Sequence, residues 1–372
     1  MAAEPLSNGA THLSVPGHYI LPVHKRPSSS VKGKGAPPVV DLGGDDDGRI
    51  AEEIVRAGWE FGFFQVVNHG HGSRKRGTPP TLVPRSRSSF PPYRKHGNYD
   101  HGVPEAVMGA MMRAAEEFFA LTADEKMAYY WNDRKKLPRF HTSLRNGTGE
   151  EVLYWRDCLK LGCHPPEWSD KPHGLGAALE PYTAAVRAAA RRVLRLAAVG
   201  LGLEEEHFEG SLSGGGMMNV NHYPPCPDLS LTLGAGPHRD PGLVTVLMEN
   251  VGGGLQILLH GDGDAAGGGM MWVDVDAAPG ALVLNFGHQM QVVSNGRLRS
   301  AEHRVVTSAR AGRTSLATFV WPEPGCTVAP AQELVLAAGE GPLYKPHSYG
   351  EFLGVYLAEG GVKESAMAHL KH

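Results

Sequence analysis

The chain has 372 residues, a mass of 39.9 kDa and a formal net charge of −3. Hydrophobic residues make up 41% and charged residues 20%, so a sizeable core is available and global disorder is not expected. No run of 18 apolar residues, no secretory signal and no CxxC pair is present, which argues against a membrane span, export and a zinc ribbon. We expect a cytoplasmic monomer with no nucleic-acid or membrane partner.

The charge is distributed unevenly along the chain. Residues 71–100 contain seven Lys or Arg, one Asp and five prolines, so this block carries +6 and the remainder carries −9. Such a segment buries too little apolar surface to offset the entropy lost on ordering. We therefore expect a disordered basic insertion at 71–100. It is either a real loop or an intron translated in error, and a transcript spanning it would distinguish the two.

The first half of the chain predicts a flexible leader at residues 1–36, followed by strands and helices over 37–205. Residues 37–44 and 61–70 are apolar runs with β-branched or aromatic side chains, so both predict strands. The stretch between them has helical spacing over residues 49–58. The apolar side of that helix comprises Ile50, Ile54, Val55 and Trp59. Two further helices are predicted, one from Pro104 onward and one over residues 175–203.

From Met217 onward the pattern changes to short apolar runs separated by Gly, Pro and Asp turns. The seven runs cover residues 217–223, 242–250, 254–260, 271–277, 281–296, 303–309 and 313–321. This spacing predicts an antiparallel sandwich or barrel within residues 206–335. Ser294-Asn295-Gly296 predicts a tight turn between two runs. A helical segment at 336–372 follows, with its helix at 349–357.

Three residues in the β region form a candidate metal site. His238 and Asp240 are two apart, so in a strand they project to the same face. His303 lies 63 residues further along and supplies a second imidazole from another strand. Two imidazoles and one carboxylate on one face, with the remaining positions open, is the arrangement of non-haem Fe(II) oxygenases.

Arg313 and Ser315 form a candidate carboxylate anchor. They too are two apart in a predicted strand, so they share a face. A guanidinium fork beside a hydroxyl suits a small carboxylate, and Arg does not deprotonate. Another feature of the region is the segment at 221–227, a strand that ends in a rigid Pro-rich turn.

These motifs resemble the plant 2-oxoglutarate/Fe(II)-dependent dioxygenases of the flavonoid, gibberellin and alkaloid hydroxylase type. The resemblance covers almost the whole chain in family order. The segments that carry it are PPVVDLGG, GFFQVVNHG, HGVPEAV, AAEEFFAL, NHYPPCP, the His-x-Asp pair, GGLQIL, SNGRLRSAEHRVV, RTSLATF and YKPHSYGEF. The resemblance implies a mixed α and β fold: a distorted double-stranded β-helix (jelly roll) flanked by helices.

The resemblance also implies roles for individual residues. His238, Asp240 and His303 match the Fe(II) ligands. Residues that match the contacts to 2-oxoglutarate are Arg313, Ser315, Tyr223 and, less closely, Asn221. Residues expected to line the substrate pocket are Phe140, Thr142, Trp155, Asn219, Arg239 and Phe319. The implied reaction is hydroxylation, or desaturation, of a small plant metabolite such as a phenolic, alkaloid or hormone. It uses O2, releases succinate and CO2, and is expected to need ascorbate as reductant.

Two alternatives are kept open. A cupin-like protein would use a metal without 2-oxoglutarate, and it would have no need for Arg313 and Ser315. An inactive family member could result if the insertion prevents folding, although all three ligand positions are intact. The sequence does not identify the substrate or the position that is oxidised.

Overall fold

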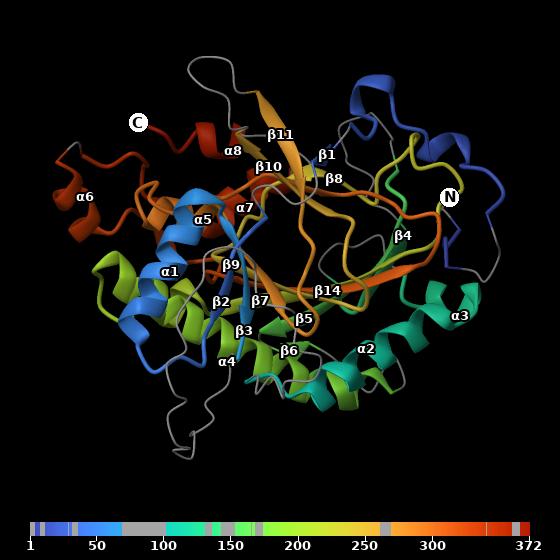
Figure 1. Ribbon diagram of the computed structural model, residues 1–372, viewed down its shortest axis with the longest axis horizontal. Coiled ribbons are helices and arrows are strands. Elements are labelled where there is room, and N and C mark those ends of the chain that lie inside the picture. Colours follow the sequence, from blue (N-terminus) through green and yellow to red (C-terminus); the bar gives the residue numbers. More distant parts are fainter. Residues whose placement is uncertain are drawn as a thin grey trace, which may run out of the picture.

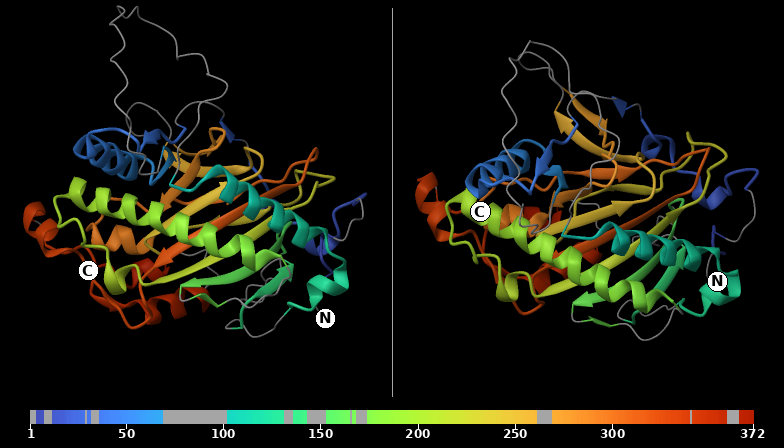
Figure 2. Two further views of the ribbon diagram at one scale, coloured as in Figure 1. Left: turned by 90° about the horizontal axis from the view of Figure 1, so that it is seen from below. Right: turned by 60° about the horizontal axis from the view of Figure 1, so that its bottom comes forward.

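Two β-sheets face each other, and helices cover the outer side of the larger sheet (Figures 1 and 2). This computed structural model describes residues 4–7, 12–28, 30–31, 36–68, 102–130, 136–142, 153–164, 166–167, 174–260, 269–339, 341–358 and 365–372. The expected basic insertion at 71–100 lies outside these ranges and remains a prediction.

The larger sheet has the strand order β2-β3-β12-β9-β14-β7-β5-β4, with β6 beside β5. All described pairings in it are antiparallel except β2 with β3. The strands are β2 (Val39–Asp41), β3 (Phe63–Val67), β4 (Arg139–Thr142), β5 (Asp157–His164), β6 (Pro166–Glu167), β7 (Gly215–Tyr223), β9 (Val244–Glu249), β12 (Leu282–Phe286) and β14 (Arg313–Trp321).

The smaller sheet has the order β1-β11-β10-β13-β8. Its strands are β1 (Ser30–Val31), β8 (Ala235–His238), β10 (Leu255–His260), β11 (Met270–Asp274) and β13 (His303–Val305). A separate pair is formed by β15 (Thr327–Val328) and β16 (His347–Ser348). The two facing sheets form the jelly-roll core that the sequence predicts.

The outer face of the larger sheet is covered by long helices (Figure 2). Period-2 alternation turns residues such as Leu159, Val220 and Leu316 outward, where they are fully buried with apolar residues of α2 and α4. The helices are α1 (Asp47–Glu60), α2 (Glu105–Ala120), α3 (Ala123–Met127), α4 (Leu175–Leu201), α5 (His288–Val293), α6 (Gln332–Ala338), α7 (Tyr349–Ala358) and α8 (Ser365–Ala368). None of the helices in the described ranges has the length and hydropathy that a bilayer crossing requires.

A second apolar cluster fills part of the space between the sheets. Phe63, Tyr223 and Val283 come from the larger sheet, and they pack with Ile257 and Val305 of the smaller sheet. The alternate residues of the larger sheet therefore face the smaller sheet, and they form the inner face on which a site between the sheets is built.

Within the predicted leader at 1–36, some described residues pack against the rest of the chain. Leu6 is 4% exposed and Tyr19 2%, and both pack with Trp155. The carboxylate of Asp157 accepts hydrogen bonds from the backbone N–H groups of Leu6 (3.1 Å) and Ser7 (2.8 Å). A few well-placed apolar residues and one buried carboxylate thus anchor the segment.

Two further predictions differ from the structure. Trp59 is 67% exposed, because 100° per residue places it on the opposite side of α1 from Ile50. The run at 281–296 is not one strand: β12 ends at Phe286, and α5 follows. Asn295 and Gly296, with φ of 49° and 82°, end α5 instead of joining two strands.

Candidate metal centre

The three predicted ligands meet between the sheets. His238 ends β8, Asp240 follows in the next loop, and His303 starts β13 directly opposite His238 in the strand register. The Nε2 atoms of His238 and His303 lie 3.8 Å and 3.7 Å from Oδ1 of Asp240. The three donor atoms all lie within 4.8 Å of one another.

The backbone orients both imidazoles. Nδ1 of His238 lies 2.8 Å from the carbonyl oxygen of Gly236, and Nδ1 of His303 lies 3.2 Å from that of Ala301. A carbonyl oxygen only accepts, so each Nδ1 carries the proton and donates it. Each Nε2 then presents a lone pair to the shared space, as a metal-ligating histidine requires.

Two side-chain hydrogen bonds orient the carboxylate of Asp240. Its Oδ2 accepts hydrogen bonds from the Thr245 hydroxyl (2.5 Å) and the Asn285 amide (2.7 Å), which leaves Oδ1 facing the two imidazoles. Burial alone would raise the pKa of this carboxyl, but the two histidines and the two hydrogen bonds outweigh burial and lower it. Asp240 therefore stays ionised.

Burial, and next the neighbouring His303, lower the pKa of His238 to about 4, so its ring is neutral at pH 7. Two imidazoles and one carboxylate, with every other polar atom of the set already bonded to protein, fit a divalent iron.

The candidate carboxylate anchor lies on β14 of the inner face. The Arg313 side chain is 7% exposed, and its Nη1 lies 3.4 Å from the Ser315 hydroxyl. Its guanidinium lies over the Tyr223 ring, 5.2 Å from the centroid. The strand register places Tyr223 opposite Arg313 and Asn221 opposite Ser315. The structure therefore brings together all four residues expected to contact 2-oxoglutarate.

Glu249 is a member of this anchor that the sequence reasoning missed. It lies opposite Ser315 on β9, and its Oε2 accepts hydrogen bonds from Nε (2.9 Å) and Nη2 of Arg313. Its side chain is 6% exposed, and burial raises its pKa although Arg313 opposes the shift. The spacing from Thr245 to Glu249, four residues in one strand, was a signal that both face the same way.

Of the six expected substrate residues, two lie on the inner face. Asn219 lies opposite Ala317, and Phe319 lies opposite Thr245, whose hydroxyl contacts Asp240. Side chains directly opposite each other share a face. The geometry therefore brings Asn219 and Phe319 to the same side of the sheet as the metal ligands.

The other four are turned elsewhere. Phe140 packs on Phe118 of α2, and the Thr142 hydroxyl donates to Asp157 beside the N-terminal segment. Trp155 is buried in that same N-terminal cluster, and its indole N–H donates to the carbonyl oxygen of Pro224. The structure does not bring these three to the metal ligands.

Arg239 also turns away from the metal ligands. It donates to the carbonyl oxygen of Ser300 (3.1 Å) and lies 3.7 Å from the carboxylate of Glu302. Its position between two ligands in the sequence therefore does not place its charge between them in space.

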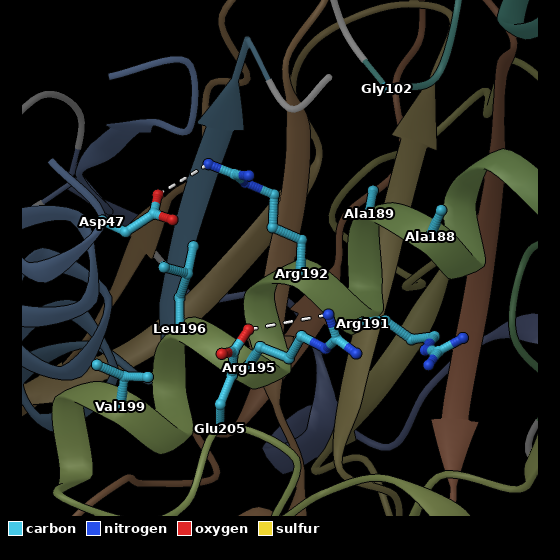
Figure 3. A pocket seen from close by; sticks show the side chains of 10 residues that line it. All are labelled: Asp47, Gly102, Ala188, Ala189, Arg191, Arg192, Arg195, Leu196, Val199 and Glu205. Atoms are coloured by element: carbon cyan, nitrogen blue, oxygen red, sulfur yellow. Dashed lines mark hydrogen bonds and ion pairs between the residues drawn. The ribbon is translucent and has the colours of Figure 1, made fainter. Parts of the chain in front are cut away.

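A groove in the described chain lies away from these residues. Figure 3 shows it on the outer surface of α4, with a volume of about 670 Å³. Arg192 there pairs with Asp47 at 3.0 Å, and Arg195 pairs with Glu205 at 3.8 Å. These mutually paired charges lie on a helix surface on the opposite side of the larger sheet from His238.

The sequence matches two family models and is similar to several plant dioxygenases. Residues 214–322 match the 2OG-Fe(II) oxygenase superfamily, and residues 99–181 match the N-terminal model described as non-haem dioxygenase in morphine synthesis. The barley 2'-deoxymugineic-acid 2'-dioxygenase is 36% identical over 93% of this chain and 91% of its own. Hyoscyamine 6-dioxygenase of Hyoscyamus niger is 33% identical over 98% of both chains.

Solved structures agree with these relatives. The crystal structure of JOX2 in complex with 2OG, Fe and JA has a TM-score of 0.76 and 28% identity, covering 98% of this chain and 95% of that one. A rice dioxygenase for auxin oxidation has a TM-score of 0.65 and 25% identity, covering 90% and 99%. The chain belongs to the 2-oxoglutarate/Fe(II)-dependent oxygenase family.

Proposed function

We propose that the chain is a dioxygenase in which His238, Asp240 and His303 hold Fe(II). Arg313 and Ser315 would bind the distal carboxylate of 2-oxoglutarate. The observation that carries the proposal is the convergence of two Nε2 lone pairs and one carboxylate oxygen. Every other polar atom of those three side chains is already bonded to protein. Bound iron with 2-oxoglutarate and O2 would supply the oxidant for hydroxylation, with release of succinate and CO2.

The remaining residues of the centre orient groups and exclude water. Thr245 and Asn285 hold Asp240 so that one oxygen faces the metal position. Tyr223 covers one side of the Arg313 guanidinium, and Asn221 lies beside Ser315. A buried guanidinium binds a carboxylate more strongly than an exposed one, because its charge is less screened.

The substrate proposed is a small metabolite. The barley and Hyoscyamus niger relatives, and a 32% identical rice protein called flavanone 3-dioxygenase 2, are named for substrates that share no common skeleton. Ascorbate as reductant, a monomeric state and a cytoplasmic location stay predictions.

The cupin-like alternative is not favoured, because it gives no role to the buried Arg313 and Ser315 beside the metal ligands. Nor does the site support an inactive member, since the structure brings all three ligands together.

The test is anaerobic Fe(II) and 2-oxoglutarate binding, followed by succinate release against flavonoids, salicylate-like acids, gibberellins and tropane alkaloids. His238→Ala and Asp240→Ala should abolish both iron retention and succinate release. The matched control is His260→Ala, at an exposed position of β10 outside the site. Undiminished iron binding and succinate release in His238→Ala would refute the assigned metal site.

A further inference from the structure

The conformation that brings Asp240 to the two histidines is not set by a strand. β8 ends at His238, so Asp240 lies beyond the last residue of that strand. A strand fixes the direction of each side chain through its regular alternation, but a residue in a loop has no such restraint. Contacts from other parts of the chain must therefore hold residues 238–240, which we call the ligand turn.

Tyr356 of α7 holds the middle of the ligand turn. Its hydroxyl donates a hydrogen bond of 2.7 Å to the backbone carbonyl oxygen of Arg239, the residue between the two ligands. Tyr356 is 8% exposed. Burial, and next the charge of Asp240, raise the pKa of its hydroxyl well above the ordinary value, so the hydroxyl keeps its proton and acts as the donor.

A second bond fixes the next carbonyl group of the ligand turn. The backbone N–H of His288, the first residue of α5, donates to the carbonyl oxygen of Asp240 at 2.8 Å. Gly287 permits this close approach, because a Cβ there would lie only 2.8 Å from the same oxygen. This bond comes from the main chain, whereas the bond to Arg239 depends on a single side-chain hydroxyl.

Aromatic packing fixes the position of Tyr356 itself. Its ring stacks on that of Phe352, with the centroids 6.1 Å apart and the planes at 26°. The ring of His288 meets Tyr356 edge-on, with the centroids 6.2 Å apart and the planes at 77°. Because the ring is already ordered by these contacts, its hydroxyl loses little further freedom when it binds the carbonyl group.

The side chain of Arg239 extends this support to the other ligand segment. Its guanidinium donates to the carbonyl oxygen of Ser300 at 3.1 Å. It also lies 3.7 Å from the carboxylate of Glu302, which immediately precedes His303. Arg239 therefore links the ligand turn to the segment that carries the third ligand, and Tyr356 holds the backbone of that linking residue.

We propose that Tyr356 is a positioning residue of the metal centre: its hydroxyl holds the Arg239 peptide so that His238 and Asp240 face the same metal ion. This inference rests on the proposed function, because it takes both side chains as Fe(II) ligands. Residues that orient metal ligands typically change metal affinity tenfold to a hundredfold. Tyr356 acts through a backbone carbonyl group and not on a ligand atom, so we expect about tenfold, the lower end of that range.

The experiment compares Tyr356→Phe with Tyr349→Phe in the full chain. Each substitution removes one hydroxyl from a buried ring of the same helix. The hydroxyl of Tyr349 is buried without a hydrogen bond to any described residue, so this variant is the matched control. Anaerobic calorimetric titration of the metal-free protein with Fe(II) gives the dissociation constant and the stoichiometry. We expect Tyr356→Phe to bind one Fe(II) per chain about tenfold more weakly, and Tyr349→Phe to bind it as the unaltered protein does.

Two further measurements separate positioning from general support of the fold. Bound Co(II), used in place of Fe(II), has visible absorption bands that respond to the arrangement of its ligands. These bands should shift in Tyr356→Phe and not in Tyr349→Phe. Tyr356→Leu, which removes the ring as well, should lower the unfolding midpoint of the metal-free protein more than Tyr356→Phe does.

The outcomes distinguish this inference from the proposed function. Failure of the unaltered chain to bind Fe(II), or equal binding by His238→Ala, would refute the proposed function and the inference with it. Unchanged Fe(II) affinity in Tyr356→Phe, or equal weakening in Tyr349→Phe, would overturn the positioning role alone. A lower unfolding midpoint in Tyr356→Phe at unchanged Fe(II) affinity would also overturn it, because the hydrogen bond would then serve only the stability of the fold.

Discussion

Glu249→Gln tests how Arg313 recognises a carboxylate. In the structure, Glu249 occupies two of the donors of Arg313, leaving Nη1 directed toward Ser315. The distal carboxylate of 2-oxoglutarate would therefore share the guanidinium with a carboxylate of the protein. The substitution keeps an amide oxygen that accepts a hydrogen bond, but it removes the competing charge.

The expected gain follows from Coulomb's law. Two like unit charges 4 Å apart repel by about 4 kcal/mol at an effective dielectric constant of 20. Because Arg313 neutralises part of this repulsion, we expect about half of it to be relieved, roughly 2 kcal/mol or thirtyfold. Glu249→Gln should therefore bind 2-oxoglutarate roughly thirtyfold more tightly.

The pH dependence gives a second signature. Burial already raises the pKa of Glu249, and a second carboxylate on Arg313 would raise it further. A pKa that rises on binding means that binding takes up a proton, so affinity increases as pH falls toward that pKa and is lost as pH rises. Glu249→Gln has no proton to take up and should lose this slope.

The assay is an anaerobic calorimetric titration of the Fe(II)-loaded protein with 2-oxoglutarate at pH 6, 7 and 8. Glu302→Gln is the control, because Glu302 is also partly buried but pairs with Arg239 outside the anchor. Weaker binding in Glu249→Gln, at an unchanged unfolding midpoint, would show that Glu249 positions Arg313 instead of competing for it.

Three more outcomes are expected. Asn285→Ala should weaken Fe(II) binding tenfold to a hundredfold in anaerobic titration, because it frees one oxygen of Asp240. Asp157→Asn should lower the free energy of unfolding by about 2–4 kcal/mol in urea and speed proteolysis of the N-terminal segment, since its charge-assisted hydrogen bonds are lost. Burial lowers the pKa of His288 to about 3 in the folded chain. As pH falls from about 6.5 toward that value, the unfolded chain binds a proton that the folded chain does not, so the free energy of unfolding decreases. His288→Gln should flatten that decline in urea unfolding at pH 7, 6 and 5, whereas exposed His260→Gln should not.

Much of the metal centre was predictable because its parts are local in sequence. Arg313 and Ser315 both lie on β14, so their shared face follows directly from the period of a strand. His238 ends β8 and Asp240 lies in the loop after it, so this pair is close in sequence but does not share one strand. The pairing of His303 with His238 could not be predicted from local spacing, because the register between distant strands depends on the whole sheet. The family resemblance supplied that connection.

The substrate side shows where the sequence reasoning fails. Alternation along β4 separates Phe140 and Thr142 from Arg139 and His141, but it does not say which pair faces inward. Apolar Phe140 suggests a substrate pocket, yet the outer face of this sheet is also apolar because α2 packs on it. Because the long helices cover the outer face, Phe140 and Thr142 point outward and Arg139 and His141 lie on the inner face.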